Sequence, residues 1–222
     1  MVPVRVLLST LAALSVATAP RAVAQTAIVA STGPSALLRS KTVRADLKLG
    51  EAQTAKLDTW LATHLADLDD RRRAAVSDGM AADGDKAAAI NQALSALYAT
   101  VLDETGKVLT AEQVRRLRQI DLQTAGVSGF SRSAVGAELK LTDTQSEVVR
   151  EAVSEYGFKV KELRDTGADL KRPSTQQDEA ASAALARVVA ALTPEQAAAY
   201  KRLCGEPINV AVVRAESRKR TD

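Results

Sequence analysis

The sequence contains very little histidine and cysteine, the residue types on which many catalytic and metal sites depend. It has one of each, His64 and Cys204, among 222 residues. A tetrahedral zinc site needs several such ligands, and a serine or cysteine nucleophile needs a histidine base with an orienting partner. His64 falls on an apolar helical seam or at its edge, which favours a packed side chain. We therefore predict no catalytic residue, no cofactor and no metal ligand.

The single cysteine also excludes a disulfide within the chain. Its position near the end of a predicted helix favours a small buried apolar side chain at Cys204. An intermolecular disulfide or a reactive thiol is the alternative, and the sequence leaves it open.

Aromatic residues and excess positive charge are both scarce. Phe, Trp and Tyr make up 3% of the chain, too few for a platform that stacks single-stranded bases. The formal charge of +3 falls to +1 when Arg5 and Arg21, in the first 24 residues, are left out. Basic residues alternate with acidic ones except in the tail, residues 214–220. We therefore predict no nucleic-acid partner.

No apolar run is long enough to span a membrane, which takes about 20 residues. The run Val6–Ala17 follows Arg5 and precedes the small-x-small sequence Ala22–Ala24. A positive residue, a short apolar run and a small-x-small site are the parts of a secretory signal peptide. We predict cleavage after Ala24, a periplasmic or otherwise exported location, and no transmembrane segment in the mature chain. An uncleaved membrane anchor is the alternative.

The sequence is rich in alanine, and its apolar residues recur at helical spacing. Four stretches show steps of three and four residues, which place one apolar seam along each helix. They are Leu57, Leu61, His64 and Leu68; Ile90, Leu94, Leu97 and Val101; Val149, Val153, Tyr156, Val160 and Leu163; and Ala181, Leu185, Val188 and Leu192. Each is short, so the pattern predicts an all-α fold of antiparallel helices and argues against an extended coiled coil.

Three helix starts carry the same signature, Leu-Thr-x-x-Gln. It occurs at Leu109–Gln113, Leu141–Gln145 and Leu192–Gln196. Threonine at the N-cap accepts a bond from the backbone three residues on, and glutamine there bonds back to the cap amide. We therefore predict three capping boxes.

An internal duplication is also visible. Val43–Leu49, followed by Gln53, matches Val135–Leu141, followed by Gln145, and each half then contains one Leu-Thr-x-Glu-Gln sequence. We predict two tandem helical-hairpin units that form a bundle or cradle. They span residues 41–125 and 134–206, after a signal peptide (1–24) and a flexible segment (25–40), and before an extended segment with a basic tail (207–222).

Two arginine clusters are the candidate partner-binding residues. They are Arg71, Arg72 and Arg73, and Arg115, Arg116 and Arg118. Asp67 lies four residues before Arg71, and Asp69 four residues before Arg73, the favourable order for ion pairs along a helix. A salt-bridged, solvated helix face is therefore the alternative to binding an acidic partner.

The repeated Leu-Thr-x-x-Gln motif in an exported helical chain resembles the Spy/CpxP-like periplasmic proteins, or LTxxQ proteins. The chain is also similar to uncharacterised exported proteins of planctomycetes, from about Val43 to Pro207. The resemblance implies a helical-hairpin fold, often a dimeric cradle. It also implies a role in envelope stress: chaperoning unfolded proteins, inhibiting a sensor kinase or sensing metals. The chain differs in holding two units and in lacking histidine- and methionine-rich stretches.

We therefore expect a non-enzymatic, exported protein that binds unfolded or envelope proteins, as a chaperone or modulator of envelope stress. A regulatory protein that docks one envelope partner is the main alternative, and a periplasmic metal sensor is a weaker one. The sequence leaves the oligomeric state open, a dimer included.

Overall fold

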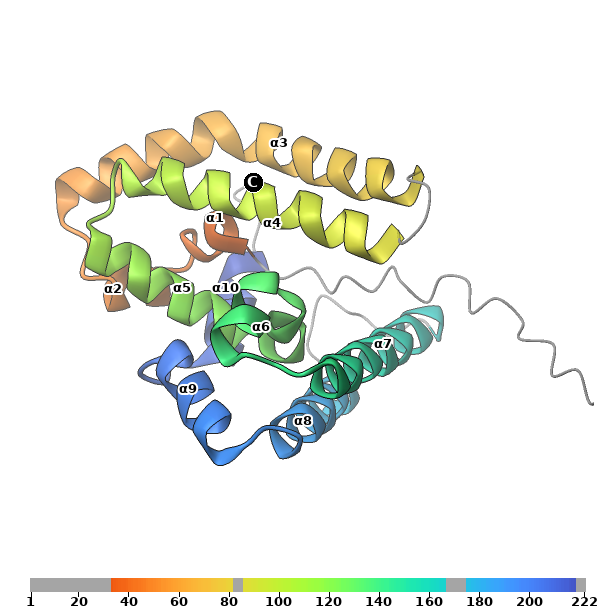
Figure 1. The fold of residues 1–222 in the computed structure, drawn as a ribbon. Helices are drawn as coiled ribbons and strands as arrows, with labels where there is room; N and C mark the ends of the chain where they lie inside the picture. Colours follow the sequence, from red (N-terminus) through yellow and green to blue (C-terminus); the bar gives the residue numbers. More distant parts are fainter. Residues whose placement is uncertain (1–32, 82–85, 167–174, 219–222) are drawn as a thin grey trace, which may run out of the picture.

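Residues 33–81, 86–166 and 175–218 are described by a computed structural model, and helices account for nearly all of these ranges (Figure 1). In chain order the elements are α1 (Gly33–Leu37), α2 (Lys41–Asp46), α3 (Glu51–Ala81), α4 (Lys86–Gly106), α5 (Ala111–Ala125), the 3₁₀ helix η1 (Gly126–Ser131), α6 (Ser133–Leu139), α7 (Asp143–Asp165), α8 (Thr175–Ala190), α9 (Pro194–Cys204) and α10 (Val210–Arg218). Within these ranges no strand occurs, which confirms the all-α prediction. The predicted signal peptide lies outside the described residues.

Two pairs of long helices, α3 with α4 and α7 with α8, dominate the fold (Figure 1). Residues of the predicted seams contribute to the packing of each pair. Leu57 and Leu61 on α3 are buried in the same core as Leu102 on α4, and Val149 on α7 is buried in the same core as Val188 on α8. Each helix therefore buries one apolar stripe and leaves charged residues on its outer face.

No helix in the described ranges is both long enough and apolar enough to cross a membrane.

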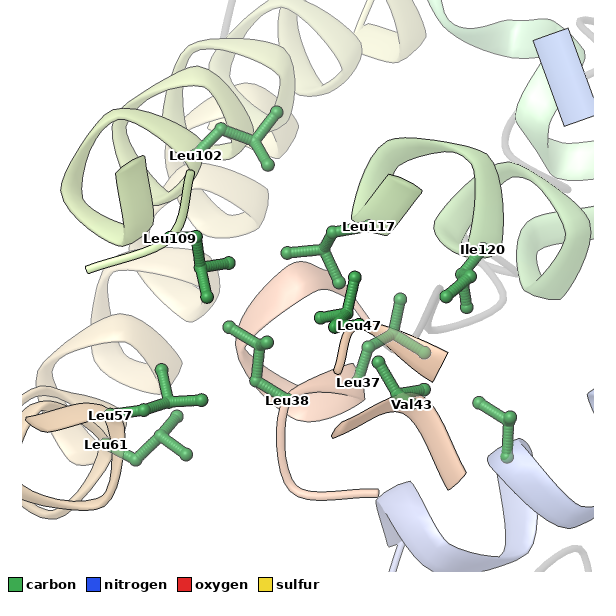
Figure 2. Packing of buried hydrophobic residues seen from close by; sticks show 11 residues of the cluster. Leu37, Leu38, Val43, Leu47, Leu57, Leu61, Leu102, Leu109, Leu117 and Ile120 are labelled. Carbon is green, nitrogen blue, oxygen red and sulfur yellow. The ribbon is translucent and has the colours of Figure 1, made fainter. Parts of the chain in front are cut away.

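Shorter helices join the two pairs and complete two hydrophobic cores. Figure 2 shows the side chains of the first core converging from several helices. Its buried members are Leu37, Leu38, Val43, Leu47, Leu57, Leu61, Leu102, Leu109, Leu117, Ile120 and Val213. In the second core, Phe130 of η1 stacks on Tyr200 of α9 at a centroid distance of 4.3 Å. Burial of these apolar groups is the main favourable contribution to folding.

The predicted units, residues 41–125 and 134–206, do not coincide with the two cores. The first core also takes Leu37 from α1 and Val213 from α10. The second core takes Leu122 from α5, together with two side chains of η1. The connection between the halves is therefore a packed part of the protein.

The prediction of a flexible segment at residues 25–40 is wrong for its described part, which begins at residue 33. Leu37 and Leu38 are fully buried there. Ser40 caps α2 by accepting a hydrogen bond from the backbone N–H of Val43 at 3.2 Å. α1 is only five residues long, too short for apolar periodicity to reveal, and tertiary burial stabilises it instead.

The prediction of an extended segment after residue 207 is also wrong, because residues 210–218 form α10. Asn209 accepts a hydrogen bond from the backbone N–H of Val212 at 3.2 Å, as an N-cap does. Val213 then becomes fully buried in the first core. Capping and burial together outweigh the preference of a valine-rich run for strands.

The duplication reappears in the way α2 and α6 end. Lys48 and Lys140 both adopt the left-handed conformation with φ of 51°, and among the described residues they are the only non-glycines with positive φ. The backbone N–H of the next residue bonds five residues back in each case, from Leu49 to Arg44 at 3.3 Å and from Leu141 to Gly136 at 3.1 Å. These are Schellman endings, in which glycine is the usual residue.

Replacing Lys48 or Lys140 with glycine is expected to stabilise the protein by about 0.5–1 kcal/mol each. Glycine removes the strain of a left-handed lysine, which outweighs the extra entropy of the unfolded glycine chain. Both lysines are exposed, so no packing is lost. Urea unfolding measures the change. Lys56→Gly, at an exposed position inside α3, is the control and is expected to cost about 1 kcal/mol. A loss of stability in both variants at 48 and 140 contradicts this explanation.

Candidate functional site

The three predicted capping boxes are present, at Thr110, Thr142 and Thr193. Each glutamine also uses its side-chain amide beyond its own helix. Gln145 Nε2 donates to the oxygen Oε1 of Gln196 at 2.7 Å, and Gln196 Nε2 donates to Oε1 of Gln145 at 3.0 Å. The same two amide groups donate to the carbonyls of Ala191 and Leu139. The pair therefore joins the starts of α7 and α9 to the end of α6.

The first half repeats this arrangement with Gln53 and Gln113. Their amide groups donate to each other's oxygen atoms at 2.8 and 3.2 Å, and also to the carbonyls of Val108 and Leu47. Gly50 stands where the second half has its N-cap threonine, and its N–H donates to Gln53 Oε1 at 3.3 Å. The repeated glutamines are thus cross-links between helices as well as caps.

Gln196→Glu is expected to destabilise the protein by about 2 kcal/mol at pH 7. In the variant a carboxylate oxygen takes the place of the amide NH₂ group. It faces the carbonyl oxygens to which that group donated, so several acceptors lose their hydrogen-bond donor. Because these acceptors raise the pKa of the new carboxyl, protonation returns one donor, and the loss should shrink as the pH falls toward 4. Urea unfolding at several pH values measures this. Gln92→Glu, on the exposed face of α4, is the control. Equal costs at the two positions contradict the cross-link.

Arg71, Arg72 and Arg73 lie on α3, and their predicted ion pairs are present in part. Arg71 pairs with Asp67 at 2.8 Å, as predicted. Arg73 pairs with Asp70 rather than with Asp69, because three residues as well as four bring side chains together on a helix. These pairs are exposed, so each contributes little to stability. Arg72 has no ion-pair partner among the described residues.

The second cluster, on α5, divides into surface and interior residues. Arg115 is exposed and pairs with Glu112 at 3.8 Å. Arg118 is exposed and has no ion-pair partner within the described ranges. Arg116 differs, because its side chain is only 17% exposed and is fully engaged within the protein. The structure therefore does not bring the six arginines into one surface.

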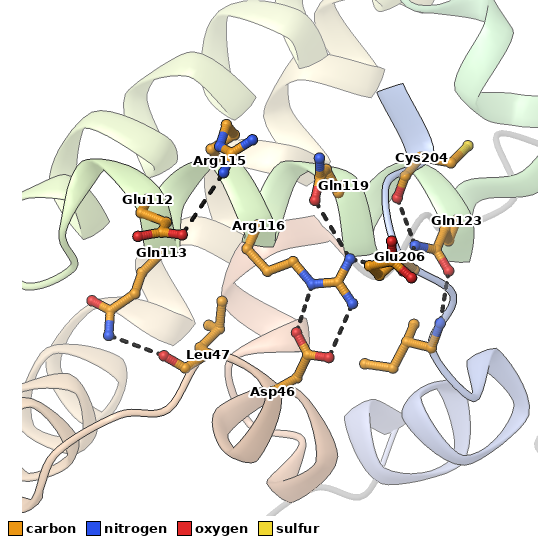
Figure 3. A network of polar contacts seen from close by, with 11 residues as sticks. Asp46, Leu47, Glu112, Gln113, Arg115, Arg116, Gln119, Gln123, Cys204 and Glu206 are labelled. Carbon is orange, nitrogen blue, oxygen red and sulfur yellow. Dashed lines mark hydrogen bonds and ion pairs between the residues drawn. The ribbon is translucent and has the colours of Figure 1, made fainter. Parts of the chain in front are cut away.

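Arg116 binds Asp46 of α2 through two parallel hydrogen bonds, of 2.6 and 2.9 Å (Figure 3). Its Nη1 also donates to the carbonyl oxygen of Glu206 at 2.8 Å. The hydrogen bonds that Arg116 donates to Asp46 raise the pKa of its guanidinium above the usual value. Such a two-point contact fixes geometry as well as charge. The prediction of Arg116 as a partner-binding residue is therefore corrected: it ties α5 to α2 and to the segment after α9.

Gln123, two turns further along α5, binds the same segment (Figure 3). Its Nε2 donates to the carbonyls of Cys204 and Glu206 at 2.7 and 2.8 Å, and its Oε1 accepts from the backbone N–H of Ile208 at 3.0 Å. One face of α5 therefore holds the connection between α9 and α10.

A buried ion pair lies at the other side of α5. Asp121 is fully buried, and its Oδ2 accepts from Nη1 of Arg132 at 2.5 Å. The Arg132 guanidinium also lies over the ring of Tyr98, 4.9 Å from its centre. Burial first, and the Asp121 charge second, raise the pKa of the Tyr98 hydroxyl well above its usual range. The group therefore links α4, α5 and the start of α6 through an ion pair whose carboxylate is fully buried.

Sequence reasoning missed this pair, although a weak signal exists. Asp121 lies four residues after Leu117 and next to Ile120, both fully buried. An acid on the apolar face of a helix is unusual unless a cation pairs with it. The spacing indicates a buried carboxylate, but it does not identify the partner as Arg132.

Cys204 is half-buried and lies beside Tyr200 on α9. Burial raises the pKa of its thiol, and the hydrogen bond from Tyr200 lowers it by less. His64 is also half-buried, stacked on Trp60 with ring centres 5.4 Å apart. Its Nδ1 lies 3.0 Å from the Trp60 carbonyl oxygen. These contacts agree with the prediction that both residues are packed side chains.

Cys204 in the folded chain is expected to react with a disulfide reagent about ten-fold more slowly at pH 8 than in the unfolded chain. The reason is that only the thiolate attacks, and burial disfavours it. Absorbance after adding the reagent, with and without 6 M guanidinium chloride, measures the two rates. We also expect a monomer on a non-reducing gel. Equal rates, or a disulfide-linked dimer, contradict this and favour the reactive-thiol alternative.

In the described part of the chain, no three histidine, cysteine or acidic side chains are grouped as a metal site would require.

Comparison of the chain with family models, with curated proteins and with solved structures finds no match.

Proposed function

We propose that the protein is an exported, non-enzymatic protein-binding protein that docks one partner in the cell envelope through the arginine-bearing stretch of α3. One observation carries the proposal: Arg71 and Arg73 are exposed on either side of Arg72, and their ion pairs are local and exposed. Such pairs cost little to exchange for an acidic partner. Arg116 is excluded from this surface because it serves the interior.

Docking is favoured over general chaperoning by the distribution of exposed apolar side chains. Among the described residues, the large ones are Phe158, Val189 and Val212, on three different helices. Single exposed apolar residues are ordinary, whereas binding of many unfolded clients needs a contiguous apolar surface. The resemblance to the LTxxQ proteins does not decide between docking and chaperoning, because that family includes several functions.

The docking proposal predicts salt-sensitive binding of one dominant partner. The chain from Gln25, which keeps every described residue, is used to capture envelope proteins at low and high salt. A triple variant in which glutamine replaces each of Arg71, Arg72 and Arg73 should capture the partner at least about ten-fold more weakly. The reason is that charges at an interface set both attraction and specificity. High salt should weaken it as well, through screening.

A triple variant of α7 is the matched control. Arg150→Gln, Lys159→Gln and Lys161→Gln remove the same charge from exposed positions on the other hairpin. Capture should survive in this variant. Equal loss in both variants, or capture that is indifferent to salt, contradicts docking through α3.

A second assay distinguishes chaperoning from docking. It measures, by light scattering, the aggregation of a client protein that unfolds on reduction. Docking predicts no suppression of aggregation at stoichiometric excess. Strong suppression together with many weak clients in the capture assay supports the chaperone function instead. Titration with zinc, nickel or copper tests the metal-sensor alternative, which requires binding tighter than millimolar.

The exported location is part of the proposal. The composition of residues 1–24 supports it, and N-terminal sequencing of the protein from a periplasmic fraction tests it. The mature chain should begin at Gln25. A chain that starts at Met1 in the membrane fraction supports an uncleaved anchor.

A further inference from the structure

The helix α10 packs against α1, α2 and α5, which all precede it in the chain. We call the surface of these three helices that α10 covers the slot. Val213 is its fully buried apolar side chain, and Val212 on the same helix is 40% exposed. α10 therefore enters the first core through one main anchor.

Most of the remaining contacts that hold α10 are polar hydrogen bonds, several of them to buried groups. The Glu216 carboxylate accepts from the hydroxyl of Ser40 at 2.5 Å and from the backbone N–H of Thr42 at 3.0 Å, at the start of α2. A carboxylate at a helix N-terminus accepts hydrogen bonds from free backbone amides and is attracted by the positive end of the helix dipole. Arg214 donates to the carbonyl of Thr124 at 2.6 Å.

The docked state also leaves polar atoms without partners. Nη2 of Arg39 donates to the carbonyl of Ser217 at 2.7 Å, but Nε of Arg39 and Oγ of Ser217 are buried with no hydrogen-bond partner. Buried unpaired polar atoms are unfavourable, and exposure to water relieves them. This opposes the burial of Val213 and weakens the hold of the slot on α10.

We propose that α10 is a detachable latch, which leaves its slot while the rest of the protein stays folded. The slot then accepts an amphipathic helix of the same chemistry from a partner, with a branched apolar residue and an acid three positions later. In the resting protein α10 blocks this site. The slot is built from α1, α2 and α5 and includes none of the arginines of α3. This inference therefore stands independently of the proposed docking function.

Hydrogen exchange in the chain from Gln25 tests the opening step without any mutation. Backbone amides of residues 210–218 should exchange at least about ten-fold faster than those of residues 117–122 in α5, because a local opening exposes the former alone. Equal protection of the two segments means that α10 opens only with global unfolding, and overturns the latch.

Binding of a labelled peptide, residues 207–222, tests the slot. It should bind the Val213→Asp chain at least ten-fold tighter than the wild-type chain, as measured by fluorescence anisotropy. The same peptide with Val213→Asp should bind neither chain. Glu216→Gln, a milder change, provides a second opened chain if Val213→Asp unfolds, as judged by circular dichroism. A folded, opened chain that does not bind the wild-type peptide overturns the proposal.

Discussion

Replacing Arg132 with methionine is expected to destabilise the protein by about 3–5 kcal/mol, because it leaves the carboxylate of Asp121 buried without a cation. Asp121 is fully buried, and the ion pair with Arg132 is the contact that compensates its charge. Methionine keeps an apolar stem of similar length but donates no hydrogen bond. It also removes the cation from the ring of Tyr98. Urea unfolding followed by circular dichroism measures the loss.

Arg187→Met is the matched control for this prediction. Arg187 also pairs with carboxylates, of Glu151 and Glu155, but all three side chains are well exposed. Its replacement is expected to cost less than about 1 kcal/mol. The double variant Asp121→Leu with Arg132→Met should recover most of the stability, since a buried pair is often replaceable by apolar groups. Similar costs for Arg132→Met and Arg187→Met contradict the role of the buried charge.

Gly205→Ala should cost about 3 kcal/mol, for two reasons that add. Gly205 ends α9 with φ of 64° and ψ of −155°, a conformation that is nearly confined to glycine. A Cβ atom there also comes 2.3 Å from Oε1 of Gln119, whose side chain must move away. That side chain is a hydrogen-bond partner of Arg116, so the network of Figure 3 is disturbed as well.

Two other glycines separate these causes. Gly126 has φ of 57° and ψ of −130° but only an ordinary contact for a Cβ atom, at 3.7 Å, so Gly126→Ala should show the backbone strain alone. Gly106 has neither positive φ nor a neighbour within 4 Å, and Gly106→Ala should be neutral or slightly stabilising. Thermal unfolding should rank the losses as Gly205, then Gly126, then Gly106. Any other order refutes the explanation.

The local features of the fold were predictable from the sequence because they depend on neighbours along the chain. The Leu-Thr-x-x-Gln starts needed only residues three apart, and all three form as predicted. The seams of α3 and α7 followed from apolar spacing, and Leu57 and Val149 are buried accordingly.

The long-range features could not be predicted in the same way. Arg116 looked like a surface residue beside Arg115, because nothing near it in the sequence shows that Asp46 lies opposite. The helical state of α10 depends on a slot formed by residues far away in the chain. The arginines of α3 therefore stay a prediction from the sequence, whereas the interior role of Arg116 was missed.

The placement of Val213 in the first core has a consequence for the order in which contacts form during folding. Val213 and Leu37 pack in the same core although they lie far apart in the chain. Such a contact forms late, because the chain must first lose the entropy of closing a long loop. The docking of α10 is therefore expected to be a late step, onto a first core that the other helices have already assembled.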